Sequence, residues 1–218
     1  MAKRFDLLVF DWDGTLIDST GAIVAAVQAA CRDLALAEPS GAQVRQVIGL
    51  GLADALRHSA PDLAEDSVPQ MIARYRHHYL ARDHELRLFE GASDLIAELH
   101  GAGYLLAVAT GKGRAGLNRS MTNCGLEPYF AATRCADECF SKPHPQMLQE
   151  LIDEFSVPEE RALMIGDTTH DLQMAINAGV AGVAVAYGAH PASALDALRP
   201  LARVHSVAEL TQWLRRHA

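Results

Sequence analysis

Four short apolar runs, with helical patterns between them, constrain the fold of this chain more than any other feature. Each run is too short to predict a helix, and each stops abruptly near Asp, Thr or Gly, as buried strands of a parallel sheet do. The runs cover residues 5–10, 104–109, 162–165 and 183–187. Strands that alternate with helices pair in parallel through right-handed crossovers. The sequence therefore predicts an α/β fold, a doubly wound, Rossmann-like parallel sheet.

Residues 16–86 interrupt this alternation, because they contain helical patterns and no run that indicates a strand. The apolar positions with helical spacing are Ile23, Val27, Cys31 and Leu34, and then Val68, Ile72, Tyr75 and Tyr79. We interpret residues 16–86 as an all-helical cap domain, inserted into a core formed by residues 1–15 and 87–218. A chain of 218 residues is long enough for such a core with a small insert.

The charge of the chain disfavours a nucleic-acid partner. Its 27 acidic and 19 basic residues give a net charge of −8, and such a surface repels a polyphosphate backbone. No apolar stretch approaches the ~20 residues that span a bilayer, and Asp6, Asp11 and Asp13 interrupt what a secretory signal would need. The four cysteines include no CxxC pair, so we expect reduced thiols in a cytoplasmic protein without a membrane partner.

Three carboxylates come directly after predicted strands. Asp11 and Asp13 follow the first run, separated by one residue, and Asp167 follows the third. In doubly wound sheets, ligands bind beyond the carboxyl ends of the strands, so these side chains are expected to meet there. Two carboxylates this close repel each other unless one binds a proton or a cation. Because a hard cation prefers oxygen ligands, we predict a Mg²⁺ site at Asp11, Asp13 and Asp167.

A hydroxyl and an ammonium group complete a set suited to phosphoryl transfer. Thr110 follows the second run, and the backbone N–H of Gly111 beside it is unobstructed. Lys142 supplies the positive charge that a phosphoryl group needs. Lys112 is a further candidate for the phosphate site, against the alternative of an exposed loop lysine. Phosphoryl transfer depends on positioning and charge neutralisation, and a carboxylate can act directly as the nucleophile.

Four motifs, in order, resemble those of the haloacid dehalogenase superfamily. The resemblance covers essentially the whole chain, and it is greatest to the phosphoglycolate phosphatase-like branch, which has a small helical cap of the C1 type. The motifs are residues 11–18 (Asp-Trp-Asp-Gly-Thr-Leu-Ile-Asp), Thr110, Lys142 and residues 166–171 (Gly-Asp-Thr-Thr-His-Asp).

The resemblance implies a role for each of these residues. Asp11 would attack phosphorus and become an aspartyl-phosphate, and it would also ligate Mg²⁺. Asp13 would protonate the leaving alcohol and then deprotonate water, while its backbone carbonyl binds the metal. Thr110 and Lys142 would hold phosphoryl oxygens, and Lys142 would orient Asp11. Asp167 would complete the metal site.

Asp171 has two interpretations. The resemblance makes it a metal ligand, directly or through a water. The segment Thr168 to Asp171 equally fits a capping box, in which a hydroxyl and a carboxylate satisfy the first N–H groups of a helix. Both roles can hold together. In the cap, residues 48–52 resemble a segment that faces the active site in relatives, and we expect them to contact the substrate.

The resemblance implies a magnesium-dependent phosphatase acting on a small phosphomonoester, with phosphoglycolate as the leading candidate. Relatives that cleave carbon–halogen bonds or phosphonoacetaldehyde have no acid/base carboxylate two residues after the nucleophile, so Asp13 disfavours both activities. Two alternatives stay open: a sugar-phosphate mutase similar to β-phosphoglucomutase, and a non-catalytic sensor of a phosphate ligand. The expected partner in each case is a small phosphorylated metabolite.

Overall fold

A six-stranded parallel sheet forms the centre of the molecule. The computed structural model describes residues 3–218, and the strands lie in the order β3–β2–β1–β4–β5–β6. They are β1 (Leu7–Phe10), β2 (Leu105–Thr110), β3 (Ala132–Cys135), β4 (Ala162–Gly166), β5 (Ala181–Val185) and β6 (Ala202–Val204). Each strand runs parallel to its neighbours. The direction of winding reverses between β1 and β4, which confirms the predicted doubly wound α/β fold.

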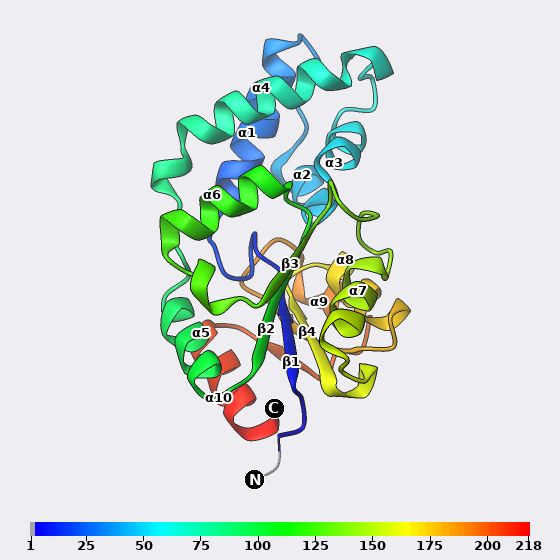
Figure 1. The fold of residues 1–218 in the computed structure, drawn as a ribbon. Coiled ribbons are helices and arrows are strands. Elements are labelled where there is room, and N and C mark those ends of the chain that lie inside the picture. Colours follow the sequence, from blue (N-terminus) through cyan, green and yellow to red (C-terminus); the bar gives the residue numbers. More distant parts are fainter. Residues whose placement is uncertain (1–2) are drawn as a thin grey trace.

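Helices cover both faces of this sheet (Figure 1). They are α5 (Ala92–Gly101), α6 (Arg114–Cys124), α7 (Gln146–Phe155), α8 (Thr169–Asn177), α9 (Ala192–Asp196) and α10 (Val207–His217). On one face, Leu8 and Phe10 of β1 pack with side chains of α5, α6 and α10. On the other face, Leu7 and Val9 pack with side chains of α7 and α8. Because successive strand residues point to opposite faces, a strand covered on both sides must be apolar throughout, as β1 is.

All four predicted strands are present, with ends that shift by one or two residues. The sequence does not predict the edge strands β3 and β6. Both are short, and both pair with a neighbour on one side only. Three of the four residues of β3 are half-buried, including Thr133 and Arg134. Such strands lack the continuous apolar run by which a central strand is recognised.

Four helices form a cap above the carboxyl ends of the strands (Figure 1). They are α1 (Thr20–Asp33), α2 (Gly41–Val47), α3 (Leu52–Ser59) and α4 (Val68–Ala81). The chain enters and leaves the cap through adjacent segments, where Ile17 bridges Leu88 and the N–H of Asp18 donates to the carbonyl of Arg87. We therefore propose residues 16–86 as the cap domain, connected to the core by this pair of linkers.

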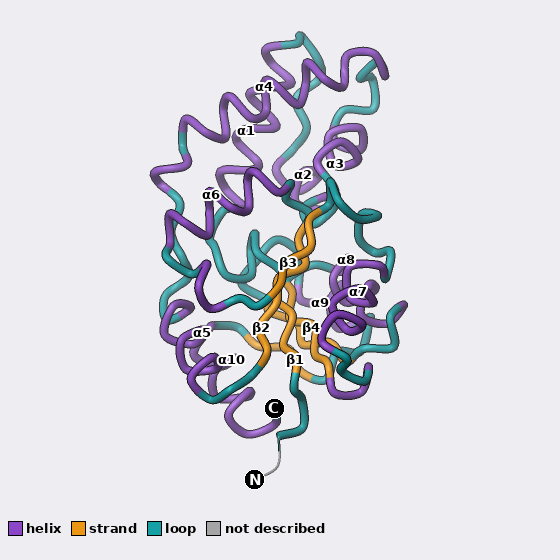
Figure 2. The backbone as a smooth tube through the Cα atoms, viewed as in Figure 1, coloured by secondary structure: helices purple, strands orange, loops and turns teal. Residues whose placement is uncertain are grey.

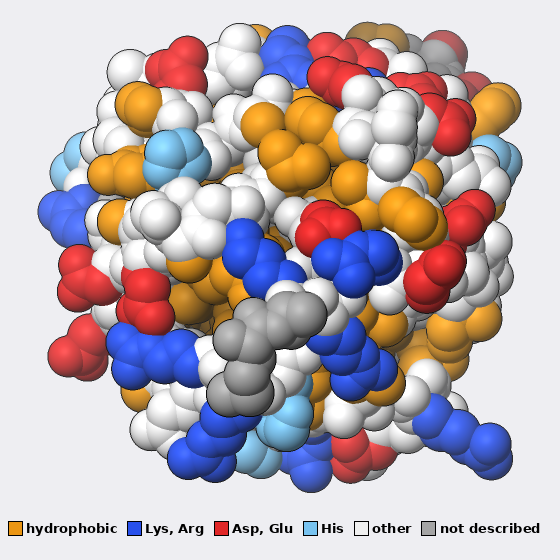
Figure 3. Space-filling view, turned by 60° about the horizontal axis from the view of Figure 1, so that its bottom comes forward, with side chains coloured by type: hydrophobic (Ala, Val, Ile, Leu, Met, Phe, Trp, Pro, Cys, Tyr) orange, Lys and Arg blue, Asp and Glu red, His pale blue; other side chains and the backbone are white. Residues whose placement is uncertain are grey.

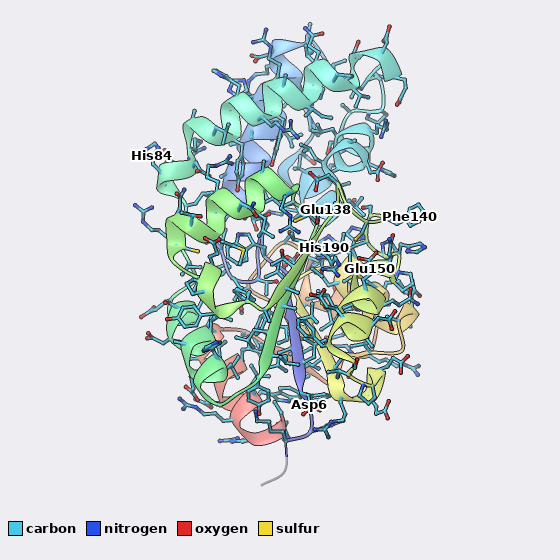
Figure 4. All side chains as sticks on the ribbon, viewed as in Figure 1. Asp6, His84, Glu138, Phe140, Glu150 and His190 are labelled. Carbon is cyan, nitrogen blue, oxygen red and sulfur yellow. The ribbon has the colours of Figure 1, made fainter. Side chains whose placement is uncertain are left out.

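The opposite end of the core carries the C-terminus and the segment that leads into β1 (Figure 1). In the view that brings this end forward, Lys and Arg side chains lie beside Asp and Glu side chains (Figure 3). Arg161 pairs there with Asp6, at the start of β1, whereas His190 lies at the cap-facing end of the sheet (Figure 4). None of the helices within residues 3–218 has the length and apolarity needed to cross a membrane.

Candidate active site

Loops from the carboxyl ends of the strands gather between the sheet and the cap (Figure 2). Phe10 of β1 pairs with Val108 of β2 on one side and with Ile165 of β4 on the other. This register brings Asp11, Thr110 and Asp167 to the same edge of the sheet, as the sequence predicts. All three side chains are buried.

A buried lysine joins two carboxylates at this edge. The ammonium of Lys142 lies 2.6 Å from Oδ1 of Asp11 and 2.5 Å from Oδ1 of Asp171. Burial alone would lower the pKa of Lys142, but the charges of Asp11 and Asp171 outweigh it and raise this pKa, so the amine stays charged. Lys142 thus holds the predicted nucleophile by one oxygen. The other oxygen, Oδ2 of Asp11, is buried and has no hydrogen-bond partner among residues 3–218.

Asp167 and Asp171 each accept further hydrogen bonds. The hydroxyl of Thr15 donates to Oδ1 of Asp167 at 2.9 Å, and the N–H of Ala189 donates to Oδ2 at 2.7 Å. Oδ2 of Asp171 accepts from the N–H of Thr168 at 3.0 Å and from its hydroxyl at 2.6 Å. Thr168 and Asp171 therefore form the capping box of α8, and Asp171 also holds Lys142. Its other interpretation, as a metal ligand directly or through a water, stays a prediction.

These residues fit a divalent cation. One oxygen from each of Asp11, Asp167 and Asp171 lies within 4.8 Å of the others. Three carboxylates against the single ammonium of Lys142 leave two uncompensated negative charges in a buried site. Burial raises the pKa of Asp11 well above its usual range and that of Asp167 to about 7, and the charge of Asp171 adds to both shifts. A divalent cation would neutralise this excess, and carboxylate oxygens suit Mg²⁺.

The side chain of Asp13 has partners different from those of the other carboxylates. The hydroxyl of Ser19 donates to its Oδ1 at 2.7 Å, and the ammonium of Lys112 lies 3.0 Å from its Oδ2. Lys112 also donates to the hydroxyl of Tyr79, on cap helix α4, at 3.1 Å. The predicted metal role of Asp13 therefore depends on its backbone carbonyl alone. The ammonium of Lys112 pairs with Asp13 in this structure. Its contact with the phosphoryl group stays a prediction.

The cap is closed over this site. The N–H of Gly51 donates to Oγ of Ser141 at 2.7 Å, and Nε2 of His170 lies 2.9 Å from the carbonyl oxygen of Gln46. Between cap and core lies a cavity of about 650 Å³. Its walls include Asp11, Asp13, Thr110 and Gly111 of the core and residues 48–52 of the cap, where a substrate contact is expected.

Gly111 allows this closure by its lack of a side chain. A Cβ added to it would clash with the carbonyl oxygen of Leu50 and would lie 2.5 Å from that of Gly49. Gly111→Ala is therefore expected to prevent the cap from closing fully and to lower kcat on the order of 10²-fold, as small misplacements at active sites do.

The kcat and KM of Gly111→Ala, with its melting temperature, would check this expectation. Gly101→Ala is the matched control, because an added Cβ at Gly101 meets no neighbouring atom of residues 3–218 within 4 Å. Wild-type kcat in a folded Gly111→Ala variant would contradict a requirement for the closure seen here.

The comparison with known proteins agrees with this geometry. Residues 8–185 match the family model for haloacid dehalogenase-like hydrolases. The chain belongs to this family. It is 36% identical over 210 residues to the probable phosphatase IndB of Dickeya dadantii (strain 3937), with 94% of this chain and 91% of the relative covered. It is 30% identical over 215 residues to the phosphoglycolate phosphatase of Vibrio parahaemolyticus serotype O3:K6 (strain RIMD 2210633), with 94% of each covered.

A solved structure supports the same family assignment. The crystal structure of a predicted phosphoglycolate phosphatase from Haemophilus somnus 129PT is similar to this chain with a TM-score of 0.88 and 26% identity. The match covers 97% of this chain and 99% of the other. Together these comparisons confirm the predicted superfamily and the enzyme class, a phosphoric monoester hydrolase.

The sequence does not predict three contacts that the structure shows in this site. Thr15 holds Asp167, Ser19 holds Asp13, and Tyr79 reaches Lys112 from the cap. Thr15 lies within the first motif, and this position could have drawn attention to it. Ser19 and Tyr79 carry no comparable signal, because a serine at the start of a helix and a tyrosine in an apolar stripe are ordinary residues.

Metal binding by this site is expected to depend on pH through Asp167. Its pKa is about 7 in the folded, metal-free protein, against an ordinary value of 3.8 that applies to the unfolded chain. Between these values the folded protein holds a proton that the unfolded chain has lost, so this group makes stability fall as pH rises to about 7. Because Mg²⁺ must displace that proton, its apparent affinity should fall by up to about tenfold per pH unit below pH 7.

Thermal denaturation in a series of Mg²⁺ concentrations at pH 6 and pH 8 measures this dependence. Asp167→Asn is expected to lose most of the Mg²⁺-induced stabilisation at both pH values, because the amide neither titrates nor supplies the charge of a metal ligand. Equal apparent Mg²⁺ affinity of the wild type at both pH values would show that Asp167 does not compete for a proton in the metal site.

Proposed function

We propose that this enzyme hydrolyses a small phosphomonoester through an aspartyl-phosphate on Asp11, with Mg²⁺ as its cofactor. The observation that carries the proposal is how the two oxygens of the Asp11 carboxylate are bonded and buried. Lys142 fixes Oδ1, while Oδ2 is buried without a partner in the part of the chain that the structure describes, and the residue lines the cavity between cap and core. A buried carboxylate oxygen without a hydrogen bond is costly, unless a ligand or cation completes its environment.

The proposed reaction has two displacements at phosphorus. First, the Asp11 carboxylate attacks phosphorus, the bond to the alcohol oxygen breaks, and Asp13 donates a proton to that oxygen. Then Asp13 takes a proton from water, the water oxygen attacks phosphorus, and the bond to Asp11 breaks to release phosphate. The hydroxyl of Ser19 and the ammonium of Lys112 hold Asp13 during both proton transfers.

The other groups neutralise and orient the phosphoryl group. Lys142 and Thr110 would contact its oxygens, and Thr110 is buried at the end of β2 beside the cavity. Asp11, Asp167 and the carbonyl of Asp13 would hold Mg²⁺, which when bound neutralises charge on the transferring group. Relatives named phosphoglycolate phosphatase make phosphoglycolate the first ester to test. A cytoplasmic location stays a prediction.

Phosphate release from a panel of monoesters tests this proposal. The panel contains phosphoglycolate, glycerol phosphate, hexose phosphates and 5′-nucleotides, each assayed with Mg²⁺ and with a chelator. Release that requires Mg²⁺ is the expected result. An isomerised sugar phosphate with little free phosphate would indicate the mutase instead. Binding of esters without any turnover by folded protein would indicate the sensor.

A further inference from the structure

The cavity extends well beyond the space that a phosphoryl group needs. It begins at Asp11 and Asp13 and continues between the four cap helices. The cap side chains along it are mostly apolar, and they include Ile23, Val27, Leu52, Leu56, Ile72 and Tyr75. Its volume of about 650 Å³ lies within the range of pockets, about 300–1,000 Å³, that enclose ligands much larger than glycolate.

The walls of this cavity are part of the hydrophobic core of the cap. Val27 and Leu56 are buried members of that core, and Ile72 and Tyr75 pack against it. Ile72 and Tyr75 are only partly buried, so their faces toward the cavity lack some of the dispersion contacts that a fully packed core would give. An apolar group of the substrate would complete the core and add stabilisation of about 25 cal/mol per Å² of apolar surface removed from water.

The charges along the cavity do not favour a substrate that carries a second acidic group, such as a carboxylate, between the cap helices. Of the residues that the structure describes, three with basic side chains line it: Arg76, Lys112 and Arg119. Lys112 already pairs with Asp13 at 3.0 Å, and Arg119 with Asp83 at 3.2 Å. Arg76 is exposed. A carboxylate placed between the apolar cap helices would therefore be desolvated without a free buried cation.

The aromatic residues of α4 add a flat apolar wall beside the reacting groups. The rings of Tyr75 and Tyr79 are stacked, with centroids 5.7 Å apart and an interplanar angle of 22°. Tyr79 reaches Lys112 with its hydroxyl, so this wall stands directly next to the acid/base Asp13. A leaving alcohol protonated by Asp13 would lie against these rings.

We infer that the physiological substrate is the monoester of an alcohol with a bulky, mainly apolar body, aromatic or aliphatic, and not phosphoglycolate. The inference rests on the proposed function, since the same phosphoryl site must hold the ester. The phosphoryl group lies at Asp11, and the apolar body lies between α1, α3 and α4.

A series of esters with similar alkyl leaving groups isolates this effect. The kcat/KM of ethyl, hexyl and 2-phenylethyl phosphate is compared with that of 2-phosphoglycolate. Hexyl phosphate is expected to exceed ethyl phosphate on the order of 10²-fold, since each buried methylene contributes about 0.8 kcal/mol, close to fourfold. 2-Phenylethyl phosphate is expected to exceed 2-phosphoglycolate as well.

A variant that fills the cavity tests the location of the apolar body. Ile72→Trp is expected to lower the hexyl-to-ethyl ratio of kcat/KM at least tenfold. Ile176→Trp is the matched control, because Ile176 is exposed on α8 and does not line the cavity. It is expected to leave the ratio unchanged. The wild-type series decides the inference by itself if Ile72→Trp fails to fold.

Two failures can be told apart. Normal Mg²⁺-dependent turnover with phosphoglycolate or ethyl phosphate preferred would overturn this inference and leave the phosphatase intact. A hexyl-to-ethyl ratio that Ile72→Trp does not change would place the apolar body elsewhere and also overturn it. Absence of turnover with these four esters alone would overturn this inference, and absence of turnover with every ester of the earlier panel as well would overturn the phosphatase too.

Discussion

Asp11→Asn is expected to abolish phosphate release, with a loss in kcat on the order of 10⁴-fold or more, as for other nucleophiles that act within a catalytic unit. The amide keeps the size of the carboxylate but cannot attack phosphorus. Its Oδ1 can still accept from Lys142, and its Nδ2 takes the place of Oδ2, which has no partner among residues 3–218. The variant is therefore expected to fold with the same geometry.

The stability of Asp11→Asn separates this loss from misfolding. Burial raises the pKa of Asp11, which means that the ionised carboxylate is disfavoured in the metal-free protein. Replacement by a neutral amide removes a group whose charged form is disfavoured at this buried position. The melting temperature without Mg²⁺ should consequently stay the same or rise, and the Mg²⁺-induced increase should shrink.

Acid quenching during turnover tests the covalent step itself. Wild-type enzyme given a ³²P-labelled ester should retain label on the protein, in a form that hydroxylamine releases, as an acyl phosphate does. Asp11→Asn should retain none. Equal label on both proteins, or phosphate release by the variant at a wild-type rate, would rule out Asp11 as the nucleophile.

The positions of the main reacting groups can be predicted from the sequence, because each group lies within one or two residues of the end of a recognisable strand. Asp11 and Asp167 come immediately after strands whose apolar runs are unmistakable, and Thr110 ends another. Once those strands pair in parallel, covalent connection alone brings the three side chains to one edge. The capping box at Thr168 and Asp171 is likewise a local pattern, and the structure contains it.

The environment of Asp13 could not be predicted in this way. Its partners are Ser19, from a linker, and Lys112, from the loop after β2. Lys112 in turn donates to Tyr79 of the cap. Which side chain reaches across such gaps depends on how the cap packs on the core, and spacing in the sequence does not encode that. The shape of the cavity has the same origin, since helices distant in sequence form its walls.

Lys142→Met is expected to damage both stability and catalysis. The chain has three lysines, and Lys142 is the one whose ammonium bridges two buried carboxylates, Asp11 and Asp171. Its removal leaves these charges without their counter-ion, and breaking a buried ion pair from one side costs about 3–5 kcal/mol. Loss of a positive group at the phosphoryl site should lower kcat by a further 10²- to 10³-fold, the order found for a single preorganised donor.

The stability of the Lys142→Met variant is expected to change with pH in a definite direction. Without Lys142 the buried carboxyls bind protons more readily when folded than when unfolded, so stability should fall as pH rises from about 4 to 8. Thermal denaturation across that range measures the slope, with Lys3→Met as the control, because Lys3 lies away from the site, over the ring of Tyr104. A slope equal to that of the wild type would contradict the counter-ion role.

A second substitution separates the structural role of Lys142 from its catalytic role. Lys142→Met combined with Asp171→Asn removes one of the two carboxylates that the ammonium neutralises, so much of the lost stability should return. The capping of α8 should largely persist, because an amide oxygen can still accept from Thr168. Phosphate release should stay low, since no ammonium then faces the phosphoryl group. Recovery of both stability and turnover in the double variant would mean that Lys142 serves only to balance Asp171, and that its contact with Asp11 contributes nothing to the reaction.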